Sequence, residues 1–183
     1  MPDTIYQLSG KEIANKMIAR RNVLAHQALE YYRFISREVE IPASDKTDKF
    51  SINNEAGGNL TITVNKIKKD GSIDKVTYLR TFKPDVTKEV RLYGFAGEDV
   101  FCVTGTEPSP IKVRMVGGDG VDSFYVDNNL HNKRNLYVYD RSDQQNKLPP
   151  PSQVKNKTST DTTVNQYDKT SYKFDRFEPI ILA

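Results

Sequence analysis

Apolar residues near the start of the chain recur every three, four or seven positions, as on one face of an α-helix. They are Ile13, Met17, Leu24, Ala28, Tyr31 and Ile35. Ser9 and Glu12 form the S-x-x-E pattern of a capping box, which predicts the start of a helix, and Pro42 predicts its end. We therefore predict a long amphipathic helix within residues 1–42, whose apolar stripe packs on a sheet.

After Pro42 the period of the pattern changes to two. Phe50 and Ile52 alternate with polar residues, and the same alternation returns in residues 60–64 and 76–78. An Asp-Gly pair at positions 70 and 71 predicts a tight turn between the last two runs. Alternation of this kind is typical of strands with one buried face, so we predict an antiparallel meander.

The next part of the chain repeats itself at an offset of 23 residues. VRLYGFAGEDVFCV, residues 90–103, aligns with VRMVGGDGVDSFYV, residues 113–126, and LYVY at 136–139 continues the pattern. A fixed period with like residues in register predicts stacked units. Leu92, Met115 and Val138 should then touch one another. Phe101 should lie against Phe124.

After Asp140 the chain becomes polar and proline-rich, with three consecutive prolines at 149–151. Such a segment buries too little apolar surface to offset the entropy lost on ordering. We therefore expect an extended arm over residues 141–183 that leads to a missing downstream region. Its expected points of attachment are Tyr167, Tyr172, Phe174 and Phe177.

Together these patterns predict a mainly β fold. The helix occupies residues 1–42 and packs on the meander, and the meander continues into a short stack of about 23-residue β-coils. The β domain, with two to three repeats, covers residues 43–140, and the arm follows. A β-sandwich is the alternative architecture, because it also has short, evenly spaced strands.

Composition excludes several functional classes. The chain has 27 basic and 24 acidic residues in close alternation, so no strong overall field attracts a nucleic acid. Its single cysteine, Cys102, rules out an internal disulfide. The motifs H-E-x-x-H, C-x-x-C, G-x-S-x-G and G-x-x-x-x-G-K-[ST] are absent. We expect no enzyme, and the sequence identifies no small-molecule substrate.

GGDGVDSFY, residues 117–125, fits the nonapeptide G-G-x-G-x-D-x-U-x of calcium-binding β-rolls. Calcium takes six to eight oxygen ligands, so a second turn must contribute, and GFAGEDVF at 94–101 is the candidate. Asp99, Asp122 and Asp119 are therefore the candidate Ca²⁺ ligands. The candidate turn glycines are Gly94, Gly97, Gly117, Gly118 and Gly120.

Two readings of these turns stay open. Phe95 stands where the second glycine of the first turn should be, and the pattern is lost after Asp140. Glycine and aspartate also form tight turns without a metal, since aspartate bonds its own backbone. The sequence is therefore consistent with both interpretations, a bound calcium ion and tight turns that bind no metal.

Nearly the whole chain resembles a segment of large Gram-negative outer-membrane proteins. The resemblance rests on IYQLSGKEI, YLRTFKPDVTKEVRLYGFAGEDVF, IKVRMVGGDGVDSF, LYVYDR and TTVNQYDKTSYKFDRFEP. In that family the segment precedes a C-terminal membrane β-barrel of surface-antigen type, and in some members it follows a calcineurin-like metallophosphoesterase domain.

This resemblance implies a place in the cell envelope, on the periplasmic or surface side of the outer membrane. The partners it implies are other domains of the same larger protein, chiefly a downstream membrane β-barrel. We therefore expect a non-catalytic connector or binding module. The alternatives are a calcium-stabilised β-roll module and an accessory domain of a phosphoesterase, although the metal-binding motifs of the phosphoesterase domain are absent here.

Overall fold

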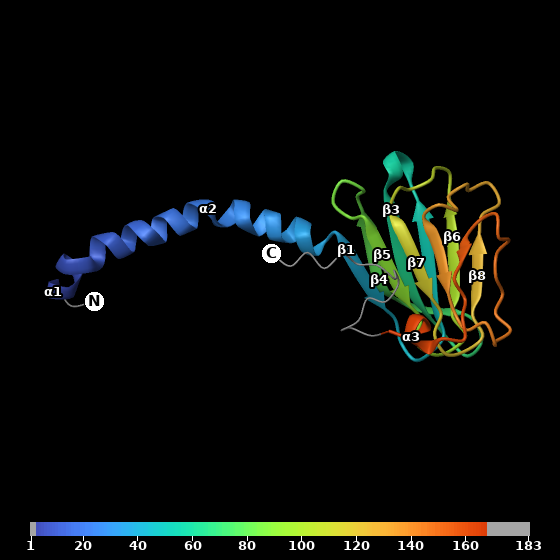
Figure 1. Ribbon diagram of the computed structural model, residues 1–183. Coiled ribbons are helices and arrows are strands. Elements are labelled where there is room, and N and C mark those ends of the chain that lie inside the picture. The colour runs from blue at the N-terminus through green and yellow to red at the C-terminus, as the bar shows by residue number, and fades with distance from the viewer. Residues whose placement is uncertain (1–2, 168–183) are drawn as a thin grey trace. The chain divides into compact units, whose positions relative to one another are not determined.

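The computed structural model describes residues 3–167 of the chain. Its contacts divide the chain into two compact units that meet between Arg37 and Glu38. The first unit is helical, and the second is formed mainly by two five-stranded sheets (Figure 1). The fold therefore combines one N-terminal helix with two sheets.

The helical unit begins earlier and ends earlier than the sequence predicts. It starts with α1, Asp3–Ile5, passes through the π-helical turn η1, Tyr6–Gly10, and continues as α2, Lys11–Ile35. Gly10 has helical angles, φ −61° and ψ −39°, so Ser9 lies inside a helical segment. The predicted helix start at Ser9 is therefore wrong, and so is an end at Pro42.

Within the helical unit, the apolar side chains of α2 are exposed. None of its residues is buried, and the predicted stripe is between 42% and 66% exposed at Ile13, Met17, Leu24, Tyr31 and Ile35. The packing of this stripe on a sheet stays a prediction, because the helix and the sheets belong to separate units. Periodicity shows that a helix has an apolar face, but it does not show what covers that face.

The first sheet has the order β1-β5-β7-β9-β10, and each neighbouring pair of strands is parallel. Its strands are β1 Glu38–Pro42, β5 Glu89–Tyr93, β7 Lys112–Val116, β9 Leu136–Tyr139 and β10 Lys155–Asn156. Strand β1 lies within the span that the sequence pattern assigned to the helix, so that assignment is wrong for residues 38–42.

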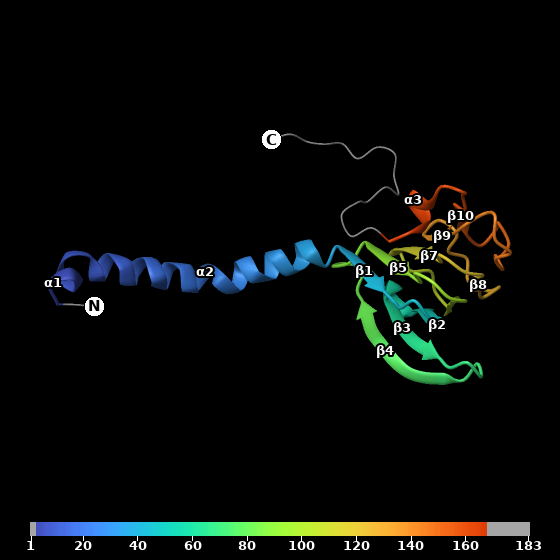
Figure 2. The same ribbon diagram turned by 90° about the horizontal axis from the view of Figure 1, so that it is seen from below.

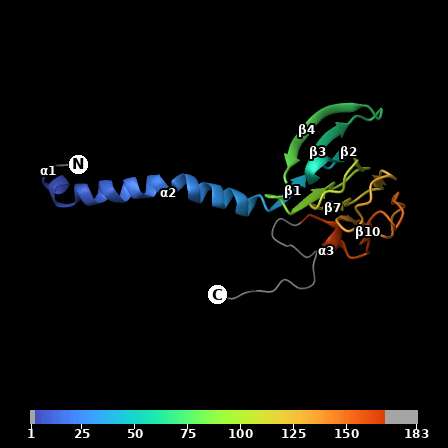
Figure 3. The same ribbon diagram turned by 90° about the horizontal axis from the view of Figure 1, so that it is seen from above.

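The second sheet has the order β4-β3-β2-β6-β8. Its strands are β2 Asp48–Asn54, β3 Leu60–Ile67, β4 Ile73–Phe82, β6 Val100–Gly105 and β8 Ser123–Val126, with the short helix η2, Ala56–Gly58, between β2 and β3. Strands β2, β3 and β4 are antiparallel, which confirms the predicted meander (Figures 2 and 3). Strands β6 and β8 continue the sheet in parallel.

The parallel strands pair at the predicted offset. Leu92 lies opposite Met115, and Met115 lies opposite Val138. In the second sheet Phe101 lies opposite Phe124, with ring centroids 4.8 Å apart. The predicted register of 23 residues is therefore confirmed. An antiparallel β-sandwich does not describe the first sheet, because all of its neighbouring strands run parallel.

The hydrophobic core lies between the two sheets. One cluster of buried residues joins Ile41, Val90, Leu92, Met115 and Val138 of the first sheet to side chains of the second. The partners in the second sheet include Phe50, Ile52, Leu60, Ile62, Phe82, Phe101 and Phe124. Alternation along each strand sends these side chains to the same face, as its period of two requires.

The outer face of the first sheet holds a buried ion-pair network. The same register places Arg91 opposite Arg114, and both donate from Nε to Glu89 Oε1, at 2.6 and 2.8 Å. Burial alone would raise the pKa of Glu89, but hydrogen bonds and charges from Arg114 and Arg91 lower it overall. The glutamate therefore bridges two aligned cations, and Glu38 and Glu40 also pair with Arg91, at 2.8 and 3.6 Å.

The described part of the predicted arm is more integrated than its composition suggests. Strand β10 pairs with β9, Val154 is buried, and Tyr167 contacts the rings of Tyr93 and Phe95. Attachment at Tyr167 is thus confirmed, and the short helix α3, Thr162–Asn165, precedes it. The other predicted attachments, Tyr172, Phe174 and Phe177, lie outside the described residues.

We predict that Phe101→Ala destabilises the protein by about 3–5 kcal/mol, because it leaves a cavity in a close-packed core. Phe101 is buried and stacks between Phe50, at 4.4 Å, and Phe124, at 4.8 Å. Urea denaturation followed by circular dichroism measures the loss. Tyr125→Ala, one residue along the same strand from Phe124 but 49% exposed, is the control and should cost less than about 1 kcal/mol. Equal losses in the two variants would contradict the stacked core.

Candidate functional site

The glycine and aspartate turns lie where the chain passes from the first sheet to the second. One turn connects β5 to β6, and the other connects β7 to β8. Gly97, Gly118 and Gly120 have φ angles of +121°, +104° and +137°, which strongly favour glycine. Phe95 has φ +73° at the position equivalent to Gly118, so the two turns share a backbone conformation despite the sequence mismatch.

An aspartate begins each crossing into the second sheet, and these aspartates form a ladder. The backbone N–H of Asp48 donates to Asp99 Oδ1 at 2.7 Å, and the N–H of Asp99 donates to Asp122 Oδ1 at 2.7 Å. The next rung is an amide, because the N–H of Asp122 donates to Asn146 Oδ1 at 2.9 Å. Each of these side chains therefore links its own turn to the preceding one through one oxygen atom.

The second carboxylate oxygen of these aspartates lacks a partner. Asp99 Oδ2, Asp122 Oδ2 and Asp140 Oδ2 are buried and accept no hydrogen bond from the described residues. All three side chains are at most 1% exposed. A buried polar atom without a partner costs about 1–3 kcal/mol, so this cluster needs a proton, a cation or a compensating contact.

Two glycines make room for these oxygens. A Cβ atom on Gly94 would lie 2.2 Å from Asp99 Oδ2, and one on Gly117 would lie 2.3 Å from Asp122 Oδ2 and 2.6 Å from Asp140 Oδ2. Neither glycine has a positive φ angle, so their role is close approach rather than backbone conformation. The predicted turn role of Gly94 and Gly117 therefore has a different physical cause from that of the other three glycines.

Asp140 is a member of the cluster that sequence analysis missed. It stands one period after Gly117, and the N–H of Gly117 donates to the carbonyl of the residue just before Asp140. Asp140 thus stands where a third repeat would have a glycine equivalent to Gly117. Its carboxyl group lies in the space next to Gly117. The offset of 23 residues places Asp140 there, but we interpreted the lost glycine only as the end of the pattern.

Asp119 does not join the other two predicted ligands. Its side chain is 56% exposed and pairs with Arg141 at 3.6 Å. Within residues 3–167 no group of three or more His, Cys, Asp or Glu side chains is arranged to hold a metal ion. The structure therefore brings Asp99 and Asp122 into one ladder, adds Asp140 and leaves Asp119 at the surface.

Burial raises the pKa of Asp99 to about 8. The hydrogen bond from the N–H of Asp48 acts in the opposite direction, because it stabilises the charged carboxylate. The negative charges of Asp122, Asp48 and Asp140 raise the pKa further. A large part of the Asp99 carboxyl groups is therefore protonated at neutral pH.

Burial is also the main cause of the raised pKa values of Asp122 and Asp140. It raises the pKa of Asp140 to about 7, where the charge of Asp122 adds to the effect and donors from Arg141 and Asn146 oppose it. It raises the pKa of Asp122 to about 6, where a backbone hydrogen bond lowers it in part and Glu98 raises it. The cluster can therefore take up protons or a cation near neutral pH.

Comparisons of the chain with protein-family models, with curated proteins and with solved structures return no match. Among the described helices, none combines the length and the apolar character needed to cross a membrane.

We predict that the stability of the protein falls as the pH rises from about 5 to about 8. The three aspartates have higher pKa values in the folded state than the ordinary value of 3.8, so the folded state binds more protons in this range. Stability is then greatest at the acid end and is lost toward pH 8, by an amount on the order of a few kcal/mol. The midpoint of urea denaturation, determined at four pH values, measures this loss of stability.

Asp122→Asn is the matched variant for this prediction. An amide keeps the Oδ1 acceptor, as Asn146 does at the next rung, but it carries no proton to lose. The dependence on pH should therefore weaken in this variant, while Asp119→Asn, at an exposed position, should keep it. A flat profile for the unmodified protein would show that the buried carboxyl groups do not titrate in this range.

Proposed function

We propose that the chain is a non-catalytic structural connector or binding module of a larger cell-envelope protein, built as a short stack of about 23-residue β-coils. The observation that carries this proposal is the register: Leu92, Met115 and Val138 align across three parallel strands, and Phe101 aligns with Phe124. The first two repeats each give one strand to each sheet, β5 with β6 and β7 with β8, and the third gives β9 to the first sheet. Neighbouring coils then bury each other's apolar faces, as in repeat proteins.

The use of the buried polar side chains supports a structural role. Glu89 binds Arg91 and Arg114, and thereby joins two neighbouring strands. Asp99 and Asp122 each accept a backbone N–H from the preceding crossing. Groups that could otherwise do acid-base chemistry are thus engaged in contacts between coils.

The location in the cell envelope is supported by the sequence resemblance alone. In the family that the chain resembles, the segment stands next to a membrane β-barrel and does not carry the catalytic motifs of the phosphoesterase domain. A stack of coils suits a spacer between domains, because each unit contacts only its neighbours and the distance across the stack is set by the number of units.

A spacer has to hold its ends at a fixed distance. We therefore predict a single, narrow distribution of distances between spin labels attached at Leu79→Cys and Asn156→Cys. Leu79 is 66% exposed on β4, Asn156 is exposed on β10, and these are the edge strands of the two sheets. Pulsed electron paramagnetic resonance in a Cys102→Ser background measures the distribution.

The control pair is Leu79→Cys with Tyr125→Cys, which lies within the second sheet. A narrow distribution for the control together with a broad one for the Asn156 pair would show that the last coil is not rigidly stacked. That result would refute the connector proposal.

The second candidate is a calcium-stabilised module. The buried, unpartnered Oδ2 atoms of Asp99, Asp122 and Asp140 favour it, because a divalent cation would neutralise them at a pH where protonation is incomplete. In this version Asp140 takes the place that the sequence motif gave to Asp119. The glycine carbonyl oxygens of the turns would supply further ligands.

We predict that millimolar CaCl₂ then raises the melting temperature at pH 7.5, whereas EDTA lowers it. Binding to the native state alone stabilises by about 2.7 kcal/mol at a hundredfold excess over the dissociation constant. Differential scanning calorimetry should show the rise in Asp119→Asn and its loss in Asp122→Asn. Loss of the rise in both variants would restore the ligand set read from the motif, and no response in the unmodified protein would remove calcium from consideration.

A further inference from the structure

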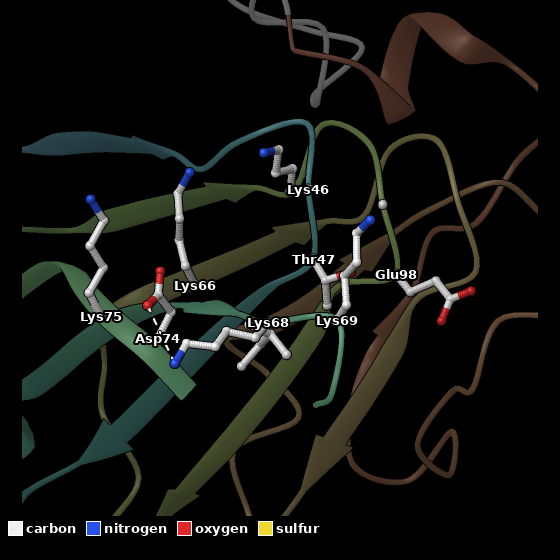
Figure 4. Close-up of a pocket in the computed structure, with 10 residues that line it drawn as sticks. Lys46, Thr47, Lys66, Lys68, Lys69, Asp74, Lys75 and Glu98 are labelled. Carbon is white, nitrogen blue, oxygen red and sulfur yellow. Dashed lines mark ion pairs between the residues drawn. The ribbon is translucent and has the colours of Figure 1, made fainter. Parts of the chain in front are cut away.

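A pocket rich in lysine lies at one end of the second sheet, beside the first rung of the aspartate ladder, since Thr47 and Glu98 in its lining precede Asp48 and Asp99 in the chain. Five lysines line it, and Figure 4 shows them around a common space: Lys46, Lys66, Lys68, Lys69 and Lys75. Asp74 and Glu98 are its two acidic residues, and its volume is about 740 Å³. We call this site the lysine pocket.

The positive charge of the lysine pocket is a local concentration. Beyond residue 37 the chain contains 21 of its 27 basic and 21 of its 24 acidic residues, which leaves no net charge. Lys68 lies 3.9 Å from Asp74, and the described residues give the other four lysines no ion pair. Five ammonium groups against two carboxylates therefore leave an excess of three positive charges in one concave site.

The backbone beneath the pocket is fixed by contacts between separate segments. The N–H of Ile67, at the end of β3, donates to Thr47 in the loop between β1 and β2, at 3.0 Å. A Cβ atom on Gly97 would lie 2.9 Å from Lys46 and 3.0 Å from Thr47, so the turn between β5 and β6 sits directly against that loop. Lysines that are distant in the sequence are thus held around one space.

An irregular pairing of β3 with β4 shapes the same site. The register shifts twice, between Val64 and Asn65 and between Asn65 and Ile67. Shifts of this kind bend a strand and redirect its side chains, and they are frequent beside binding sites. Lys66 lies within the irregular stretch, so its direction into the pocket is set by the strand and does not depend on a flexible loop.

The chemistry of the lining selects one class of ligand. The four lysines without an ion pair repel one another, and a multivalent anion would remove that repulsion. None of the described residues that line the pocket is an arginine. The lining therefore presents the point charges of lysine ammonium groups and lacks the planar guanidinium group that binds a carboxylate through two hydrogen bonds. Point charges of this type bind the dense charge of phosphate. The volume exceeds that of one phosphate group and is typical of small-molecule sites.

We propose that the lysine pocket binds a ligand that carries two or more closely spaced phosphate groups. This chemistry occurs in soluble polyphosphate esters, and it is also presented by phosphate headgroups gathered at a membrane surface. This proposal does not depend on the connector role, because it rests only on the residues that line the lysine pocket.

Isothermal titration calorimetry of the full chain with inorganic tripolyphosphate at low salt tests the proposal. We expect saturable binding that weakens as NaCl is added, and at least tenfold weaker binding of inorganic orthophosphate. The double variant Lys66→Gln, Lys75→Gln should lose at least tenfold in affinity, and Lys46→Gln, Lys69→Gln should do the same. The control Lys133→Gln, Lys157→Gln removes the same charge from exposed positions outside the pocket and should change affinity less than twofold. Melting temperatures confirm that each variant is folded.

Sedimentation with vesicles of phosphatidylcholine and phosphatidylglycerol identifies the source of the phosphate. Binding to these vesicles that is lost with Lys66→Gln, Lys75→Gln would assign a lipid surface, and binding of tripolyphosphate alone would assign a soluble ester. Failure of both probes to bind, or an equal loss in the pocket and control variants, would overturn the proposal.

Discussion

Parallel pairing of strands at a constant offset brings chemically similar side chains face to face, and it joins β5, β7 and β9 in the first sheet and β6 and β8 in the second. For apolar residues this arrangement is favourable, and the rings of Phe50, Phe101 and Phe124 stack almost parallel, at 3° and 8°. For charged residues the same arrangement places like charges together in a buried environment, where their repulsion is strongest. The fold therefore has to compensate wherever the repeat contains an ionisable residue.

The protein compensates in two different ways. Arg91 and Arg114 lie opposite each other, and Glu89 accepts a hydrogen bond from both, while Glu38 and Glu40 also pair with Arg91, so carboxylates balance the cations. Within residues 3–167, Asp99 and Asp122 of the aspartate ladder have no such counterion. Asp99 and Asp122 receive one backbone hydrogen bond each and keep one buried oxygen without a partner. The pKa values of Asp99 and Asp122 are therefore high, because burial destabilises the charged carboxylate more than the neutral carboxylic acid.

This difference makes the stability of the protein depend on pH, because the pKa values of the buried aspartates lie near neutral pH. The lysine pocket lies where the pairing of β3 and β4 becomes irregular, and Gly97 and Glu98 from the turn between β5 and β6 complete its lining. Regular pairing therefore accounts for the stacked strands, and irregular pairing beside them shapes the proposed binding site.

The sequence by itself determined the meander, the register of 23 residues and the glycine positions, because each depends on local periodicity or on the spacing of identical residues. Only the tertiary structure showed that Phe50 extends the aromatic stack, since the inserted hairpin of β3 and β4 separates it from Phe101 by far more than one period. It also placed Asp140 in the space beside Gly117 and gathered the lysines of one pocket from three segments. What covers the apolar face of α2 is not determined by the sequence, because an amphipathic pattern specifies which side chains share a face but not what lies against them.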